Sequence, residues 1–463
     1  MKGSALKNRE EILRGSLWKA VLALAIPVII NSFLQTMYNL TDTYWLGKLG
    51  TEQLAAINLV SPVQQVIVNF GSGITMAGSV LIAQYIGAGV RENAKSMANQ
   101  IFVCAMCFAA ACAALCFLFT PAIVGWLKAD GETRLHAVAY LRVVIWDMPF
   151  LYMVNIFSAV HQAQGDTVKP MFLNLGGILL NMALDPALIV LCDLGVAGAA
   201  LATLLAKLAP AVVAFFLLTR KEQEIRLEKS CMRLEREKVS MIVRIGLPTA
   251  IGGSTMQLGF LLMSRNVFAY GSQAMAAYGI GNKINGLITL PSNGIGSAVA
   301  TIVGQNIGAG QTERAGKGYR IAMRISVVFL FIGGMILSRV GISTAIAGIF
   351  SEDGAVIGMA ADFLRVMAFW CFANGVYNST IGLFNGTGHT EVTMAVNVSR
   401  LWIFRFLTLW FCESVLRMGV RSIWYSVVVS NGICSAILYL LYLTGLWKRP
   451  KIKTRRSEPD QRG

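Results

Sequence analysis

The chain has 463 residues, of which 55% are hydrophobic and only 14% charged, and its mean hydropathy is +0.60. A soluble protein carries roughly a quarter charged residues, so this composition excludes an ordinary soluble enzyme or binding domain. The net charge of +16 would favour nucleic-acid binding in a soluble protein. Here the basic residues gather in alternate loops between apolar stretches, which is a membrane orientation signal, and we expect no nucleic-acid partner.

Apolar stretches of about 20 residues, the length that crosses a bilayer, recur along the whole chain. They predict an all-α polytopic membrane protein with twelve transmembrane helices, surrounded by the lipid bilayer. The expected limits of the spans are 17–45, 54–82, 93–120, 135–158, 168–191, 196–219, 240–266, 275–303, 317–340, 357–382, 392–413 and 421–446.

Lysine and arginine crowd the N-terminus, every second loop and the tail. This bias predicts a multi-pass protein of the cytoplasmic (inner) membrane with both termini in the cytoplasm. The expected segments are an N-terminal six-helix bundle (1–219), a basic cytoplasmic linker (220–239), a C-terminal six-helix bundle (240–446) and a basic cytoplasmic tail (447–463).

The two predicted bundles repeat each other in sequence. The segment Ala83–Gly89 (AQYIGAG) returns as Gly304–Gly310 (GQNIGAG) 221 residues later, and Pro27 meets Pro248 at the same spacing. Six spans restore the starting side of the membrane, so we expect the bundles to be related by an axis along the membrane normal, with a cavity between them. Paired bundles that rock about a central site are typical of secondary transporters.

Ionisable residues inside a membrane are costly and are candidates for function. Asp42 lies near the outer end of the first predicted span. Tyr38 and Asn39 precede it by four and three residues, so all three are expected on one face of a helix, where Tyr38 and Asn39 could also contact a substrate.

A second carboxylate, Asp185, lies in the fifth span with Asn181 one turn before it and a proline directly after it. Counting residues from the outer loops places Asp42, Asn181, Asp185 and Thr203 in one layer of the N-terminal bundle. Such oxygen ligands suit a hard cation such as Na⁺, and the two carboxylates could equally share a proton. The sequence leaves Na⁺ and H⁺ open as the coupling ion and predicts no other cofactor.

Three more groups of residues are weaker candidates. Asp147 in the fourth span could contact substrate, and Lys207, one turn after Thr203, could pair with Asp185 or extend toward a cavity. Met256, Phe260 and Met263 in the seventh span could contact apolar substrates, although packing is the alternative. Arg400 and Arg405 in the eleventh span could be structural charges or could contact substrate.

The motifs together resemble the multidrug and toxic compound extrusion (MATE) family, more its DinF-like branch than its NorM-like branch. They are Pro27, Asn39–Thr43 (NLTDT), the twin QxIGAG segments, Gln164–Thr167 (QGDT) and Asn181–Pro186 (NMALDP). The resemblance implies two six-helix bundles and export of small organic, often cationic or amphipathic compounds in exchange for H⁺ or Na⁺. It also implies a cation site at Asp42, Asn181, Asp185 and Thr203. The sequence departs from NorM-like members, which carry acidic residues in the C-terminal bundle, because none stands between Gly246 and Gly310.

Two other functions are weighed against this one. A lipid-linked oligosaccharide flippase of the same superfamily would use basic cavity residues for a pyrophosphate, and Lys207, Arg265, Lys283 and Arg405 are candidates. A membrane-embedded enzyme would need clustered nucleophiles, metal ligands or bases, and no such motif is present. We therefore expect a transporter of small molecules that is no enzyme, and a monomer.

Overall fold

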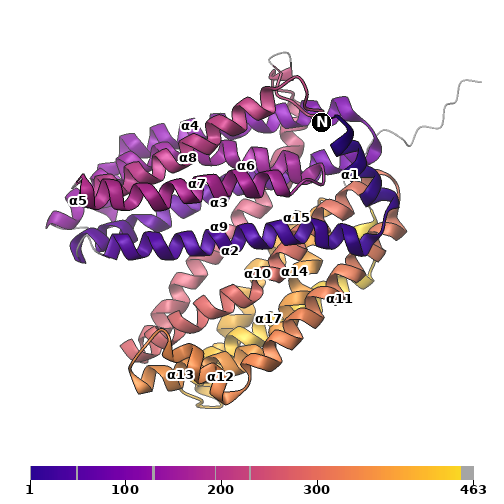
Figure 1. Ribbon diagram of the computed structural model, residues 1–463. Coiled ribbons are helices and arrows are strands. Elements are labelled where there is room, and N and C mark those ends of the chain that lie inside the picture. Colours follow the sequence, from indigo (N-terminus) through magenta and orange to yellow (C-terminus); the bar gives the residue numbers. More distant parts are fainter. Residues whose placement is uncertain (1, 48–50, 128–130, 193, 229–230, 450–463) are drawn as a thin grey trace, which may run out of the picture. The chain divides into compact units, whose positions relative to one another are not determined.

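The computed structural model describes residues 2–47, 51–127, 131–192, 194–228 and 231–449. Over these ranges the chain is built of helices, without a strand (Figure 1). Most of the predicted tail, 450–463, lies outside the described residues, as do Lys48, Lys128 and Lys229 of the loops.

The chain divides into two compact units, each built from two segments. The N unit comprises Ile30–Ile251 together with residues 2–14, and the C unit comprises Gly15–Ile29 together with residues 252–449. Two helices therefore pass from one unit to the other, and each does so within four residues of an interior proline, Pro27 or Pro248. A proline removes one backbone hydrogen bond from a helix, so each of these two helices is weakened close to the boundary between the units.

The bundle limits taken from the sequence, 1–219 and 240–446, stay a prediction about membrane topology.

The first half of the chain forms one short N-terminal helix followed by long helices that are broken at glycine turns. The elements are α1 (Lys2–Arg14), α2 (Leu17–Gly47), α3 (Thr51–Ala88), α4 (Arg91–Trp126), α5 (Gly131–Val144), the 3₁₀ turn η1 (Ile145–Asp147), α6 (Met148–Ala163), α7 (Val168–Pro186), the π-helix η2 (Ala187–Leu191) and α8 (Gly195–Thr219).

The second half begins with α9, which starts after the linker. Its elements are α9 (Arg236–Phe268), α10 (Ser272–Gly308), α11 (Thr312–Leu337), α12 (Val340–Gly348), α13 (Gly354–Phe369), α14 (Cys371–Gly386), α15 (Thr390–Val398), the π-helix η4 (Ser399–Arg405), α16 (Phe406–Ser414), α17 (Arg421–Leu443) and the 3₁₀ turn η5 (Leu446–Lys448).

Among the described residues, eleven helices are long and apolar enough to cross a membrane, and a bent pair formed by α13 and α14 makes up to twelve. Large apolar side chains such as Leu118 and Phe216 stand exposed on these helices, as expected where lipid replaces water. The predicted all-α polytopic fold is confirmed.

The sequence repeat is also a repeat of backbone conformation. Gly89 and Gly310, which follow the ends of α3 and α10, both have a left-handed backbone, with φ of 78° and 76°. Gly165 and Gly388, which separate α6 from α7 and α14 from α15, do the same at 80° and 84°. Only glycine adopts this conformation without steric cost, so the repeat preserves the residues that set the turns.

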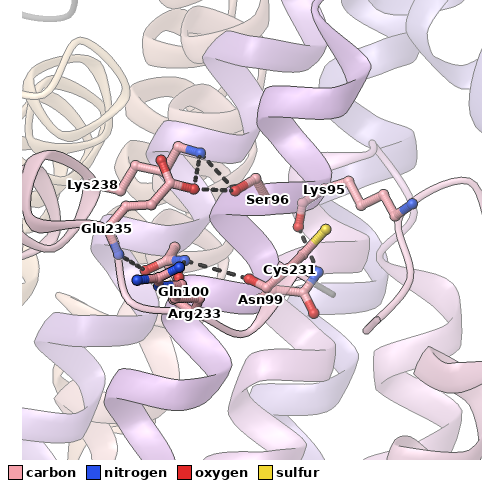
Figure 2. A network of polar contacts seen from close by, with 8 residues as sticks. All are labelled: Lys95, Ser96, Asn99, Gln100, Cys231, Arg233, Glu235 and Lys238. Atoms are coloured by element: carbon pink, nitrogen blue, oxygen red, sulfur yellow. Dashed lines mark hydrogen bonds and ion pairs between the residues drawn. The ribbon is translucent and has the colours of Figure 1, made fainter. Parts of the chain in front are cut away.

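The basic linker is bound along α4 of the same unit, as Figure 2 shows. Asn99 donates to the carbonyl oxygen of Arg226 at 3.1 Å and accepts from the backbone N–H of Glu228 at 2.8 Å. Gln100 repeats this pattern with the carbonyl of Arg233 at 2.7 Å and the N–H of Glu235 at 3.0 Å. Two fully buried amides therefore satisfy backbone groups that a loop would otherwise leave to water.

Candidate functional site

The candidate site of the N unit begins at the end of α7. Asn181 and Asp185 lie one helical turn apart, with exposed fractions of 1% and 0%. Pro186 follows at once, and the chain continues as the π-helix η2. A π-helical turn inside a transmembrane helix often marks a functional position.

The polar atoms of these two side chains are buried without a protein partner. Among the described residues, neither carboxylate oxygen of Asp185 accepts a hydrogen bond, and neither amide atom of Asn181 is paired. The two side chains are close enough to interact, but their geometry falls short of a hydrogen bond. Buried polar groups are costly unless something satisfies them, so this position is chemically suited to a cation.

Asp42 reaches the same region from α2. Its carboxylate is half-buried and interacts electrostatically with that of Asp185. Tyr38, one turn earlier, interacts with both carboxylates, and its hydroxyl lies beside that of Thr203. Helices α2, α7 and α8 therefore bring Asp42, Asp185 and Thr203 together.

Thr203 is buried in α8, and its hydroxyl donates to the carbonyl oxygen of Ala199 at 3.1 Å. That bond uses the hydroxyl proton and leaves the oxygen lone pairs available. Tyr38, Asn181 and Thr203 also line a cavity of about 90 Å³. Asn39 is exposed, and its side-chain oxygen accepts a long 3.4 Å bond from Gln35 on the same helix, so the structure does not bring it to the other site residues.

Lys207 is paired with Asp147, not with Asp185. Asp147 is completely buried in the turn η1, and its second carboxylate oxygen has no partner. Lys207 also interacts with the charge of Asp42 and lines the cavity.

Sequence reasoning missed Tyr140, a buried tyrosine of α5 that interacts with Asp42, Asp147 and Asp185, because a tyrosine on an amphipathic helix looks like an ordinary core residue.

The candidates of the C unit separate into cavity and core. Met256 and Phe260 line a cavity of about 440 Å³ inside that unit. Met263 is fully buried in an apolar cluster with Val267 and Trp424, so it packs the core.

Comparison with known proteins shows two matches to one family model. The MatE model matches residues 27–187 and again 248–411, and the starts of the two matches have the 221-residue spacing of the internal repeat. Together the matches cover well over half of the chain.

Individual relatives agree with the family model. A probable multidrug resistance protein NorM of Thermotoga maritima is 26% identical over 98% of both chains. A multidrug export protein MepA of Staphylococcus saprophyticus is 25% identical, over 93% of this chain and 94% of its own. A solved outward-facing multidrug resistance MATE family transporter of the MOP superfamily has the same fold, with a TM-score of 0.89 and 24% identity over 95% of this chain and 98% of its own.

Proposed function

The chain belongs to the MatE family, and we propose that it is an antiporter that exports small organic, often cationic or amphipathic compounds in exchange for H⁺ or Na⁺. It is a multi-pass multidrug efflux transporter and not an enzyme. The observation that carries the proposed coupling is the interacting pair of carboxylates in the N unit, half-buried Asp42 and fully buried Asp185, the second of which has no hydrogen-bond partner for either oxygen among the described residues.

Electrostatics explains how these carboxylates couple ion and substrate. Two interacting carboxylates away from water are unfavourable unless a cation neutralises them. One proton or one Na⁺ shared by Asp42 and Asp185 removes this penalty, with Asn181 and Thr203 supplying neutral oxygen ligands. Loading and release of the ion therefore stabilise different arrangements of the helices that carry the site, which is what alternating access requires.

The finer assignment to the DinF-like branch is also a proposal. It is supported by the position of the buried carboxylates in the N unit and by the cavity of the C unit, whose described lining residues include no acidic side chain. A coupling-ion site in the C unit would need such a carboxylate.

Orientation and assembly complete the proposal. The basic linker and the basic N-terminus support cytoplasmic termini, and we expect the protein to function as a monomer. Cysteine labelling from either side of sealed vesicles tests the first statement, and the mass of the detergent-solubilised protein tests the second.

The proposed coupling is tested by dye efflux in proteoliposomes under an imposed pH or Na⁺ gradient. Asp42→Asn and Asp185→Asn are expected to abolish gradient-driven efflux while the protein stays folded. Glu132→Gln, which changes an exposed carboxylate on α5, is the matched control and should keep full activity. Full coupled efflux in both aspartate variants would exclude them from the mechanism.

A further inference from the structure

The cavity of the C unit is polar and basic. Its lining includes seven asparagines together with Arg400 and Arg405, and no described lining residue is acidic. Helices α10, α14, α15 and α17 and the π-helix η4 supply these side chains. Neither the N-unit carboxylates nor the ion exchange assigned to them requires such a cavity.

Arg405 is buried with an exposed fraction of 3%. Its described partners are neutral: it donates to the hydroxyl of Ser430 and to the side-chain oxygen of Asn431, both at 3.2 Å. Its guanidinium also lies over the ring of Phe260 at 5.8 Å. None of these groups supplies a full negative charge.

Arg400 is held even more loosely. Its guanidinium stacks over the ring of Tyr377 at 4.5 Å and contacts the sulfur of Met256 at 3.7 Å. Its Nε is buried without a hydrogen-bond partner. A guanidinium has five N–H donors in a planar fork that matches a carboxylate, and among the described residues the only acceptor of an Arg400 donor is the weak thioether sulfur of Met256.

No carboxylate neutralises these two charges in the part of the C unit that the structure describes. The ion pairs there join Asp362 to Arg365 and Arg421 and do not extend to Arg400 or Arg405. The two guanidiniums instead interact with each other. Like charges close together are unfavourable, and a bound anion would offset their repulsion.

The π-helix explains why both arginines reach one cavity. Residues five apart in an α-helix, with 3.6 residues per turn, point in clearly different directions. A π-helix is hydrogen-bonded from i to i+5, so its turn holds more residues than an α-helical turn. Because η4 spans Ser399–Arg405, Arg400 and Arg405 point in more similar directions than they would in an α-helix. The N unit also has a π-helix, η2, which begins two residues after Asp185, so in each unit a π-helix lies beside the ionisable side chains of a candidate site.

We propose that this cavity binds the carboxylate of an amphipathic organic anion, through Arg400 and Arg405, with asparagine amides as further donors. The apolar part of the ligand would contact Met256 and Phe260, which line the same cavity. The inference rests on the proposed transport function and extends its substrates from cations to anions. The phosphate of an anionic lipid headgroup is an oxyanion that the same guanidiniums would bind, and it is the alternative source of the ligand.

The test is equilibrium binding of a fluorescent probe to the purified full-length protein in detergent, without any ion gradient. Dansyl-aminoundecanoate is compared with the same molecule carrying a neutral carboxamide in place of the carboxylate. We expect the carboxylate to bind roughly tenfold more tightly, as charge-assisted hydrogen bonds imply. Equal affinity of the two probes would overturn the proposal.

Variants locate the binding. Arg400→Gln and Arg405→Gln should each remove most of the preference for the carboxylate, and Arg400→Lys should keep part of it. Arg324→Gln, on the exposed side of α11, is the matched control. If Arg405→Gln does not fold, the test rests on Arg400→Gln, because Arg400 makes few contacts. An Arg400→Gln protein that still prefers the carboxylate probe to the carboxamide probe overturns the assignment of the site to this cavity.

Competition identifies the source of the anion. Displacement of the probe by octanoate supports a soluble carboxylate, displacement by phosphatidylglycerol alone supports a lipid headgroup, and displacement by neither contradicts an anion site. Asp185→Asn should bind the probe normally, so a failure of this proposal is distinguishable from a failure of ion coupling.

Discussion

Lys207 forms an ion pair with Asp147, a fully buried carboxylate 60 positions earlier in the chain. The region therefore contains three carboxylates and one ammonium, and the ammonium is already bound to one of the three. Among the described residues Asp42 and Asp185 form no ion pair, although the charge of Lys207 also acts on Asp42, and this is the imbalance that a coupling ion would correct.

Breaking this ion pair should be strongly destabilising. Lys207→Met leaves a buried, uncompensated Asp147, and removing one partner of a buried pair costs about 3 kcal/mol. Thermal unfolding in detergent should show the loss, and the double variant Asp147→Asn/Lys207→Met should recover much of it. If the double variant loses as much stability as the two single variants together, the two side chains do not stabilise each other.

Ion binding at Asp185 should stabilise the folded protein. If Na⁺ is the coupling ion, a concentration of about 100 times its Kd raises stability by about 2.7 kcal/mol, and the melting temperature rises with it. Asp185→Asn should abolish this Na⁺ dependence, whereas Glu132→Gln should preserve it. A melting temperature of the wild type that Na⁺ does not change would leave the proton as the coupling ion.

The amides of Asn99 and Gln100 should hold the linker against α4. Replacing either by alanine leaves two backbone groups of the linker unpaired, at a cost of about 1–3 kcal/mol for each buried group. Limited trypsin digestion should then cut faster after the basic residues of 226–233. Gln223→Ala, within the linker but outside this network, should behave like the wild type; equal cleavage in all variants would contradict the anchoring role.

The same linker should loosen in acid. The side chain of Lys238 lowers the pKa of Glu235, and the side chains of Lys95 and Arg226 lower the pKa of Glu228. A carboxyl with a lowered pKa in the folded state stabilises that state above its ordinary value of 4.5, and the stabilisation is lost as pH falls through the lower, folded value. Labelling of Cys231 with dithiodipyridine, which reacts in acid, should therefore accelerate below about pH 4.5, with Cys231→Ser as the control; a rate independent of pH would contradict the prediction.

Glycine allows close helix packing in the C unit. A Cβ on Gly382 of α14 would lie 2.2 Å from the backbone oxygen of Gly296 of α10, whereas a Cβ on Gly333 of α11 would meet nothing within 4 Å. Gly382→Ala should therefore destabilise the protein by about 1–3 kcal/mol through overpacking, and Gly333→Ala should not. Equal melting temperatures of the two variants would show that α10 and α14 can separate without cost.

Periodicity and composition by themselves determined the membrane class, the succession of spans, the internal repeat and the grouping of Asn181 with Asp185. These features are local, because hydropathy over about 20 residues and helical spacing decide them. The tertiary structure decided which charges meet: that Lys207 pairs with Asp147, that Tyr140 joins the carboxylates, that Met263 packs the core, and that a π-turn brings Arg400 and Arg405 into one cavity. Such contacts depend on how each helix is rotated about its axis and on how close neighbouring helices lie. Neither quantity can be derived from local sequence patterns, because both result from packing between residues far apart in the chain.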